Sequence, residues 1–182
     1  MIKRLIPILV MLGMFSMMAC EPNNPFNTVP AYDVEANLKI DNVKIAGYLD
    51  TARIDSLYRI HDPSGVVIIL QKEGVGTRPT TNTVIYTDYT GYLFDKKIFE
   101  TSIENVAREA DIFNDKMIYT PFQFVFNTGT VIQGWDIAFR KLRPGSKAVF
   151  IIPSPWGYRD KEQNRIPANS VLIFKIDFLG ID

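Results

Sequence analysis

One segment near the C-terminal end constrains the fold most, because it predicts one short helix set among strands. From Gln133 to Leu142 the apolar residues are spaced by three and four positions, which places them on one helical face. Pro144-Gly145 ends this pattern. Runs typical of strands stand on both sides, at 122–126, 148–152 and 171–178. Many strands around one helix predict an α+β arrangement.

Further strands are predicted upstream of this segment. Val66 to Leu70 is a β-branched run, and Thr83 to Gly91 alternates between two sets of side chains. Asp95-Lys96-Lys97 predicts a tight turn before the next short strand at Ile98-Phe99. A weak helical stripe runs through the polar segment 103–117.

The first 19 residues predict a signal peptide that is removed. Lys3 and Arg4 precede an apolar run, Leu5 to Met18, which is short for a bilayer span of about 20 residues. Ala19-Cys20 follows, and a small residue before a lone cysteine resembles a bacterial lipobox, with Met17 where leucine is usual. We therefore expect Cys20 to carry lipid; the alternative is an ordinary signal peptide that leaves an unused thiol.

Residues 20–31 are polar and rich in Asn and Pro, which predicts a flexible tether. A helical leader is expected over 32–62. Its first part, Tyr32 to Leu49, has one apolar face, and a second helical piece is predicted over 50–58. The leader either packs on the domain that follows, at 63–182, or pairs with a partner.

Composition excludes several classes of function. The chain has 20 basic and 20 acidic residues, and loss of Lys3 and Arg4 with the signal leaves 18 basic ones, so nothing favours nucleic acid as a partner. His61 is the only histidine, which excludes histidine-based metal sites and Ser/His or Cys/His nucleophiles. No Gly-rich phosphate loop is present, and we expect no cofactor and no metal.

The aromatic residues predict an apolar cup. Trp135 stands at the start of the predicted helix, and aromatic and branched residues return on later strands. Such a cup suits a small apolar ring with a carbonyl group beside it, and proline is the ring that a protein meets most often.

The order of motifs resembles the FKBP family of peptidyl-prolyl cis-trans isomerases over roughly 65–182. The resemblance is carried by Val131-Ile132-Gln133-Gly134-Trp135-Asp136, Leu142-Arg143-Pro144-Gly145, Ile152-Pro153, Trp156-Gly157-Tyr158 and Ile166-Pro167-Ala168-Asn169. It implies a curved antiparallel β-sheet wrapped around one short α-helix.

The resemblance also implies site residues. Trp135 matches the indole at the floor of the family's pocket, and Tyr89 matches its strand tyrosine in Tyr-Thr-Gly. Phe99 matches the aromatic wall after the hairpin, and Phe122 matches the first aromatic residue of the next strand.

The remaining matches lie at the rim of the expected pocket. Val131 and Ile132 flank the helix entrance, where the backbone N–H of Ile132 is implied to bind a carbonyl. Tyr158 matches a tyrosine whose hydroxyl reaches the bound carbonyl, and Ile166 and Phe174 close the far side.

The chain departs from the family pattern at the rim. Glu100 stands where aspartate is common and is expected to belong to the catalytic set, although a solvated strand-end charge is the alternative. Arg159 replaces a glycine, Ala168 replaces a proline, and the loop 159–165 is highly charged. An insertion at about 101–120 borders the expected pocket.

The alternative for each of these aromatic residues is that it only fills the hydrophobic core, where aromatic side chains are common. The appearance of these family positions in one order favours a pocket, and we assign the alternating residues Phe124 and Leu172 to the core.

We expect a monomeric prolyl isomerase, lipid-anchored in a bacterial envelope, that acts on proline-containing exported clients and possesses a pocket of the kind that tacrolimus-like macrolides enter. The first alternative is a non-catalytic peptide-binding module or holdase that uses the same cup. A third hypothesis is an assembly factor bound to a complex through the leader helix.

Overall fold

The computed structural model describes residues 31–182. Its elements follow the order α1 (Val34–Thr51), β1 (Tyr58–His61), β2 (Val67–Lys72), β3 (Val84–Tyr92), β4 (Ile98–Thr101), α2 (Glu104–Glu109), β5 (Phe122–Val125), α3 (Gln133–Phe139), β6 (Lys147–Ile152), the 3-10 turn η1 (Ser154–Trp156) and β7 (Leu172–Ile181).

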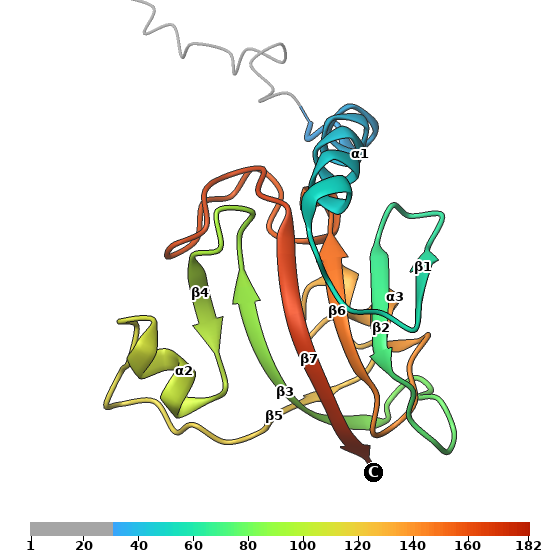
Figure 1. The fold of residues 1–182 in the computed structure, drawn as a ribbon, viewed down its shortest axis with the longest axis vertical. Helices are drawn as coiled ribbons and strands as arrows, with labels where there is room; N and C mark the ends of the chain where they lie inside the picture. The colour runs from blue at the N-terminus through green and yellow to red at the C-terminus, as the bar shows by residue number, and fades with distance from the viewer. Residues whose placement is uncertain (1–30) are drawn as a thin grey trace, which may run out of the picture. The chain divides into compact units, whose positions relative to one another are not determined.

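The strands form one antiparallel sheet of seven strands with the order β1-β2-β6-β7-β3-β4, and β5 pairs with β3 (Figure 1). The long strands β3 and β7 pair from Ile85↔Ile181 to Tyr92↔Ile173, with one register shift after Tyr86. The predicted curved antiparallel sheet with one short helix is confirmed.

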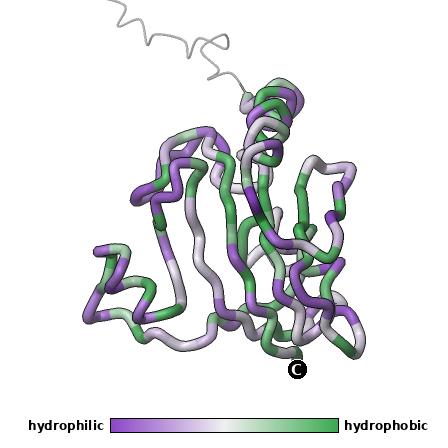
Figure 2. The backbone as a smooth tube through the Cα atoms, in the orientation of Figure 1, coloured by the Kyte–Doolittle hydropathy of each residue, from purple (hydrophilic) through white to green (hydrophobic). Residues whose placement is uncertain are grey.

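Both faces of the sheet are covered, which explains why β6 reads as a continuous apolar run. Ala148, Phe150 and Ile152 pack into the cluster that contains α3. The intervening residues Val149 and Ile151 pack into a second cluster with Ile45 of α1. Hydrophobic segments accordingly follow the central strands, and hydrophilic ones gather in the outer loops (Figure 2).

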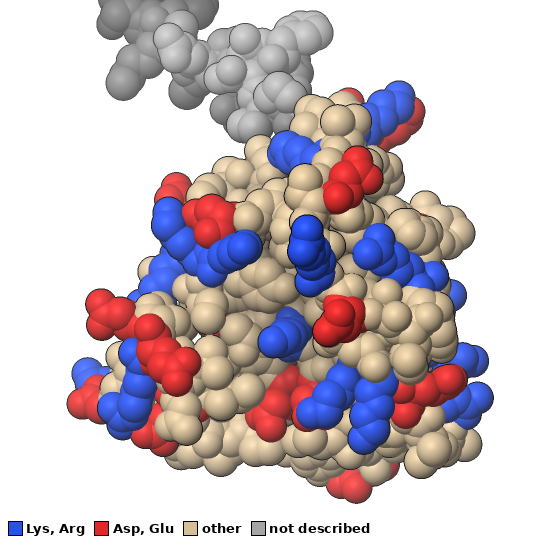
Figure 3. Space-filling model, viewed as in Figure 1, with Lys and Arg blue, Asp and Glu red and all other residues tan. Residues whose placement is uncertain are grey.

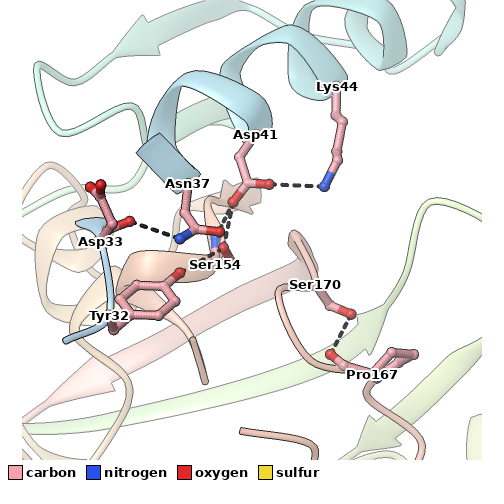
Figure 4. Close-up of polar contacts among 8 residues, drawn as sticks. All are labelled: Tyr32, Asp33, Asn37, Asp41, Lys44, Ser154, Pro167 and Ser170. Atoms are coloured by element: carbon pink, nitrogen blue, oxygen red, sulfur yellow. Dashed lines mark hydrogen bonds and ion pairs between the residues drawn. The ribbon is translucent and has the colours of Figure 1, made fainter. Parts of the chain in front are cut away.

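The leader helix α1 packs on the domain, as in the first of the two alternatives. Asp41 is 1% exposed, and its Oδ2 accepts hydrogen bonds from the backbone N–H and the hydroxyl of Ser154, at 2.8 and 2.6 Å (Figure 4). Lys44 pairs with its other oxygen at 3.2 Å. The Tyr32 hydroxyl lies 3.1 Å from the same serine oxygen. A buried carboxylate with several donors fixes the helix in one position.

The prediction of a second helical piece over 50–58 is wrong. α1 ends at Thr51, and Tyr58–His61 forms β1 on the edge of β2. The N–H of Leu57 already donates to the Leu70 carbonyl at 2.7 Å. Pairing with a sheet edge thus overrides a weak local periodicity, and the sheet begins inside the segment assigned to the leader.

The predicted stripe over 103–117 gives only the short helix α2, Glu104–Glu109. Residues 1–30, which include the expected signal peptide, Cys20 and all but the last residue of the tether, lie outside the described part. Among residues 31–182 no helix has the length and apolar character needed to cross a membrane.

Replacing Asp41 with alanine tests how the leader is held. Asp41→Ala leaves the N–H of Ser154 without its acceptor in a place where the serine is fully buried. We expect the free energy of unfolding to fall by about 2–4 kcal/mol, measured by urea denaturation.

The matched control is Lys39→Ala, which removes an exposed ion pair with Glu35 on the same helix. It is expected to change stability by less than about 0.5 kcal/mol. Equal stability of the two variants would show that α1 is not held by this contact.

Candidate functional site

An open cavity of about 390 Å³ lies where α3 meets the sheet. We call it the cup. β3, β4, β5, the entrance of α3, the loop after β6 and β7 all contribute to its lining: Tyr89, Glu100, Phe122, Thr130, Val131, Ile132, Trp135, Tyr158 and Phe174. The structure therefore brings together every predicted site residue of the domain except Phe99 and Ile166, and it adds Thr130.

Trp135 stands at the centre of the aromatic cluster. Its ring centroid lies 5.2 Å from that of Tyr89, 5.8 Å from that of Phe122 and 5.3 Å from that of Phe174, with interplanar angles of 82°, 86° and 90°. These edge-to-face contacts place positive ring edges against negative ring faces. The indole is 4% exposed, so the cluster immobilises it while part of it still lines the cup.

The indole N–H of Trp135 is buried and has no hydrogen-bond partner among the described residues. Leaving a buried donor unpaired costs about 1–3 kcal/mol. Such unpaired groups are uncommon and are often found at functional sites.

Close approach of α3 to the sheet depends on Gly134. A Cβ atom there would collide with the side chain of Ile152 on β6. Ile132 is the N-cap residue and supplies no side-chain cap, so N–H groups of the first turn are left without the partner that such a cap provides. Val131 and Ile132 are half-buried beside this helix start.

Gly91 on β3 makes room for the aromatic wall. A Cβ atom at Gly91 would lie 2.5 Å from the Phe99 ring and 2.9 Å from the Phe174 ring. These two rings meet edge to face, with centroids 5.6 Å apart. Phe99 thereby supports Phe174, which lines the cup.

Phe99 and Ile166 lie in a neighbouring cavity of about 520 Å³. Each is 5% exposed. Glu100 and Tyr158 line both cavities, and they form the boundary between them. The predicted far side of the pocket is thus a second compartment.

Burial raises the pKa of the Tyr89 hydroxyl well above its ordinary value, and the negative charge of Glu100 raises it further. The pKa of Tyr158 is raised by the same two causes in the same order. Both hydroxyls therefore stay protonated at neutral pH and keep their protons as donors. Burial also raises the pKa of Asp136, although this carboxylate accepts the N–H of Asn127 at 2.8 Å.

The loop that carries Tyr158 is tied to the leader. Arg159 has a left-handed backbone, with φ of 58°, at a position where the sequence resemblance expects glycine. The left-handed conformation costs a residue with a Cβ atom about 1–2 kcal/mol of conformational free energy. Its N–H donates to the Ser154 carbonyl at 3.0 Å, and its guanidinium lies 5.9 Å from the Tyr32 ring centroid. Arg159 thus contacts both Ser154 and Tyr32 of the leader, and the sequence alone did not predict this link between the loop and the leader.

Charged groups are interspersed over the face shown in Figure 3, in agreement with the balanced composition. Within residues 31–182, no three His, Cys, Asp or Glu side chains lie close enough together to hold a metal ion.

Comparison with known proteins was made at the level of sequence and of fold. A sequence profile for FKBP-type peptidyl-prolyl cis-trans isomerase matches residues 76–179. FK506-binding protein 1 of Saccharomyces cerevisiae is 32% identical over 107 residues, which cover 58% of this chain and 82% of the yeast protein. The isomerase FkpA of Aeromonas hydrophila is 30% identical over 119 residues, 65% of this chain and 39% of that protein.

A longer relative, FK506-binding protein 5 of Dictyostelium discoideum, is 37% identical over 79 residues, which are 43% of this chain and 5% of that protein. The chain thus spans well under half the length of two of these relatives.

Solved structures show the same fold. FkpA of Escherichia coli has a TM-score of 0.60 with 22% identity, over 81% of this chain and 64% of that one. A peptidyl-prolyl isomerase of Pseudomonas syringae has a TM-score of 0.60 with 23% identity, over 82% and 96%. The match over 76–179, the shared fold and the aromatic cup together show that the chain belongs to the FKBP-type peptidyl-prolyl cis-trans isomerase family.

Proposed function

We propose that this protein is a peptidyl-prolyl cis-trans isomerase that seats a prolyl ring on Trp135. The observation that carries the proposal is the cup itself. Its floor is an immobilised indole, its walls are aromatic and branched apolar side chains, and Glu100 is the one charged residue in its lining.

The reaction needs no nucleophile or cofactor. The planar amide is held by a barrier of about 18–20 kcal/mol because its C–N bond is partly double. Twisting the bond removes the resonance form with opposite charges on oxygen and nitrogen. Water stabilises that polar planar form, so transfer into an apolar cup disfavours the ground state relative to the less polar twisted state. Interactions stronger in the twisted state then accelerate the step.

Particular residues are proposed for each role. The hydroxyl of Tyr158 and the N–H of Ile132 donate to the carbonyl oxygens of the substrate beside the ring. Tyr89 and Trp135 contact the prolyl ring, and the negative charge of Glu100 sets the electrostatic field across the mouth of the cup. The remaining proposed substrate contacts are Phe122, Val131 and Phe174 in the cup, with Phe99 and Ile166 in the second compartment.

We further propose that the protein acts on exported clients in a bacterial envelope, held to a membrane by lipid on Cys20 and working as a monomer. The support is the lipobox-like end of the signal sequence. Uncatalysed prolyl isomerisation takes tens of seconds or longer, which is slow enough to limit the folding of a protein, and a catalyst without a cofactor suits a compartment that lacks ATP.

The direct test is exchange NMR or a protease-coupled assay on short Xaa-Pro peptides. The purified protein is expected to accelerate cis–trans exchange. Binding of the same peptides without acceleration would instead support the non-catalytic module or holdase. A folded sample that neither binds these peptides nor accelerates their exchange would contradict the proposal.

A Tyr158→Phe variant tests the hydroxyl alone. One neutral hydrogen bond contributes about 1 kcal/mol, so we expect kcat/KM to fall roughly five- to tenfold with the fold unchanged. Tyr86→Phe is the matched control, because that hydroxyl donates to Asp182 at 2.6 Å and does not line the cup. An unchanged rate in Tyr158→Phe would remove this hydroxyl from the mechanism.

A Glu100→Gln variant tests the electrostatics of the rim. The carboxylate disfavours a second negative charge, so its removal is expected to lower the pKa of Tyr89 and Tyr158. Both should remain above the ordinary value of 10.0, because burial is the larger cause. NMR titration of the Tyr158 ring carbon that bears the hydroxyl measures the shift for a single tyrosine, and neither hydroxyl should titrate between about pH 6 and 9 in either protein. A rise in either pKa would contradict this assignment.

A further inference from the structure

The cup opens into a longer depression. The neighbouring cavity of about 520 Å³ shares Glu100 and Tyr158 with the cup, and its floor includes Phe99 and Ile166. A third hollow, of about 690 Å³, shares Ile112, Arg165 and Ile166 with the second. We call the second and third hollows together the side trench.

The outer wall of the side trench is the insertion between β4 and β5. Residues of the segment 107–119 line the second cavity opposite the loop 163–166. α2 stands outside β4 at one edge of the sheet, away from α1 (Figure 1). The insertion therefore adds a wall beside the cup and leaves its mouth open.

The insertion begins beside Tyr89, a residue that lines the cup. The Thr101 hydroxyl donates to the Tyr89 carbonyl at 2.8 Å, and the Tyr89 N–H donates to the Ser102 hydroxyl oxygen at 3.0 Å. The Ser102 hydroxyl in turn donates to Asp88 at 2.8 Å. Both Thr101 and Ser102 are buried, which fixes where the insertion leaves the sheet.

The wall is also braced within itself. Arg108 pairs with Glu104 at 2.6 Å, and its guanidinium lies 3.5 Å from the centroid of the Phe113 ring. That ring stacks on Tyr119, with centroids 5.5 Å apart and an angle of 14°. The Phe113 and Met117 side chains nevertheless remain 36% and 38% exposed while they line the second cavity. The two side chains thus gather exposed apolar surface in one hollow, and apolar surface gathered in this way marks binding sites, whereas single scattered apolar residues do not.

We propose that the side trench binds the client chain on one side of the proline, as an extended segment that carries a bulky apolar side chain. This inference rests on the proposed function and names the clients of the same site. The occupant follows from continuity with the cup, because a chain whose proline sits on Trp135 must leave past Glu100 and Tyr158 to enter the trench.

The chemistry of the lining matches an extended polypeptide. Phe113 and Met117 offer apolar contacts, whereas the amide side chains of Asn114, Gln163 and Asn164 can bond to main-chain N–H and C=O groups. The lining of the trench carries charges of both signs and therefore selects neither an anion nor a cation: Asp95, Glu100, Asp115 and Glu162 against Lys96, Lys97 and Arg165.

The experiment compares three peptides with the full-length protein. One is a tetrapeptide around Xaa-Pro, and the others extend it on the N-terminal or the C-terminal side. Each extension has about five residues including one phenylalanine, which spread over about 17 Å when extended. Because the trench leaves the cup in one direction, we expect one extension to raise kcat/KM by roughly five- to tenfold and the other to have little effect.

The double variant Phe113→Ser/Met117→Ser is expected to abolish this gain. The matched control is Ile118→Ser, because Ile118 is 81% exposed on the same insertion and lines neither hollow. It should keep the gain. Amide chemical-shift mapping of the unmodified protein gives a second measurement: the favoured long peptide should shift resonances of 107–119, and the tetrapeptide should not.

The outcomes separate the two proposals. Acceleration of the tetrapeptide without any gain from either extension, or a gain that survives in the double variant, overturns the side trench and leaves the isomerase intact. No acceleration of any peptide overturns the proposed isomerase itself.

Discussion

The edge-to-face packing of Trp135 against three rings from β3, β5 and β7 is the contact on which the candidate site depends. It joins the short helix α3 to the strands that form the walls of the cup, so the same rings act as core and as lining. Two glycines permit it. Gly134 lets α3 approach β6, and Gly91 lets two phenylalanines pass over β3. An apolar hollow with a fixed floor follows from this packing.

The sequence predicted the elements that have strong local signals. The spacing from Gln133 predicted α3. The alternation over 83–91 separated two sets of side chains, and the structure shows that the set of Ile85, Thr87 and Tyr89 is the buried one. The family resemblance gave the residues around the cup, because motifs in a fixed order specify positions that periodicity cannot. It could not show that Phe99 and Ile166 face a second compartment, since that division depends on how the insertion and the charged loop fold beside each other.

Other features were decided by tertiary contacts. β1 forms because Leu57 and the residues after it find the free edge of β2, which no local pattern encodes. The burial of Asp41, by contrast, could have been predicted from the sequence. It lies three residues after Leu38 and four before Ile45, on the apolar stripe of the leader, so its carboxylate had to be buried and needed donors. Ser154 supplies them.

The central claim, that a prolyl ring rests on the indole of Trp135, is tested most directly by NMR of both tryptophans with an Xaa-Pro peptide. Trp156 is the internal reference, because its N–H donates to the Ser64 carbonyl at 2.7 Å and it does not line the cup. We predict intermolecular nuclear Overhauser effects between proline ring protons and Trp135, with a shift of its indole N–H and little change at Trp156. Binding that leaves the Trp135 resonances unmoved and without such effects would contradict the claim.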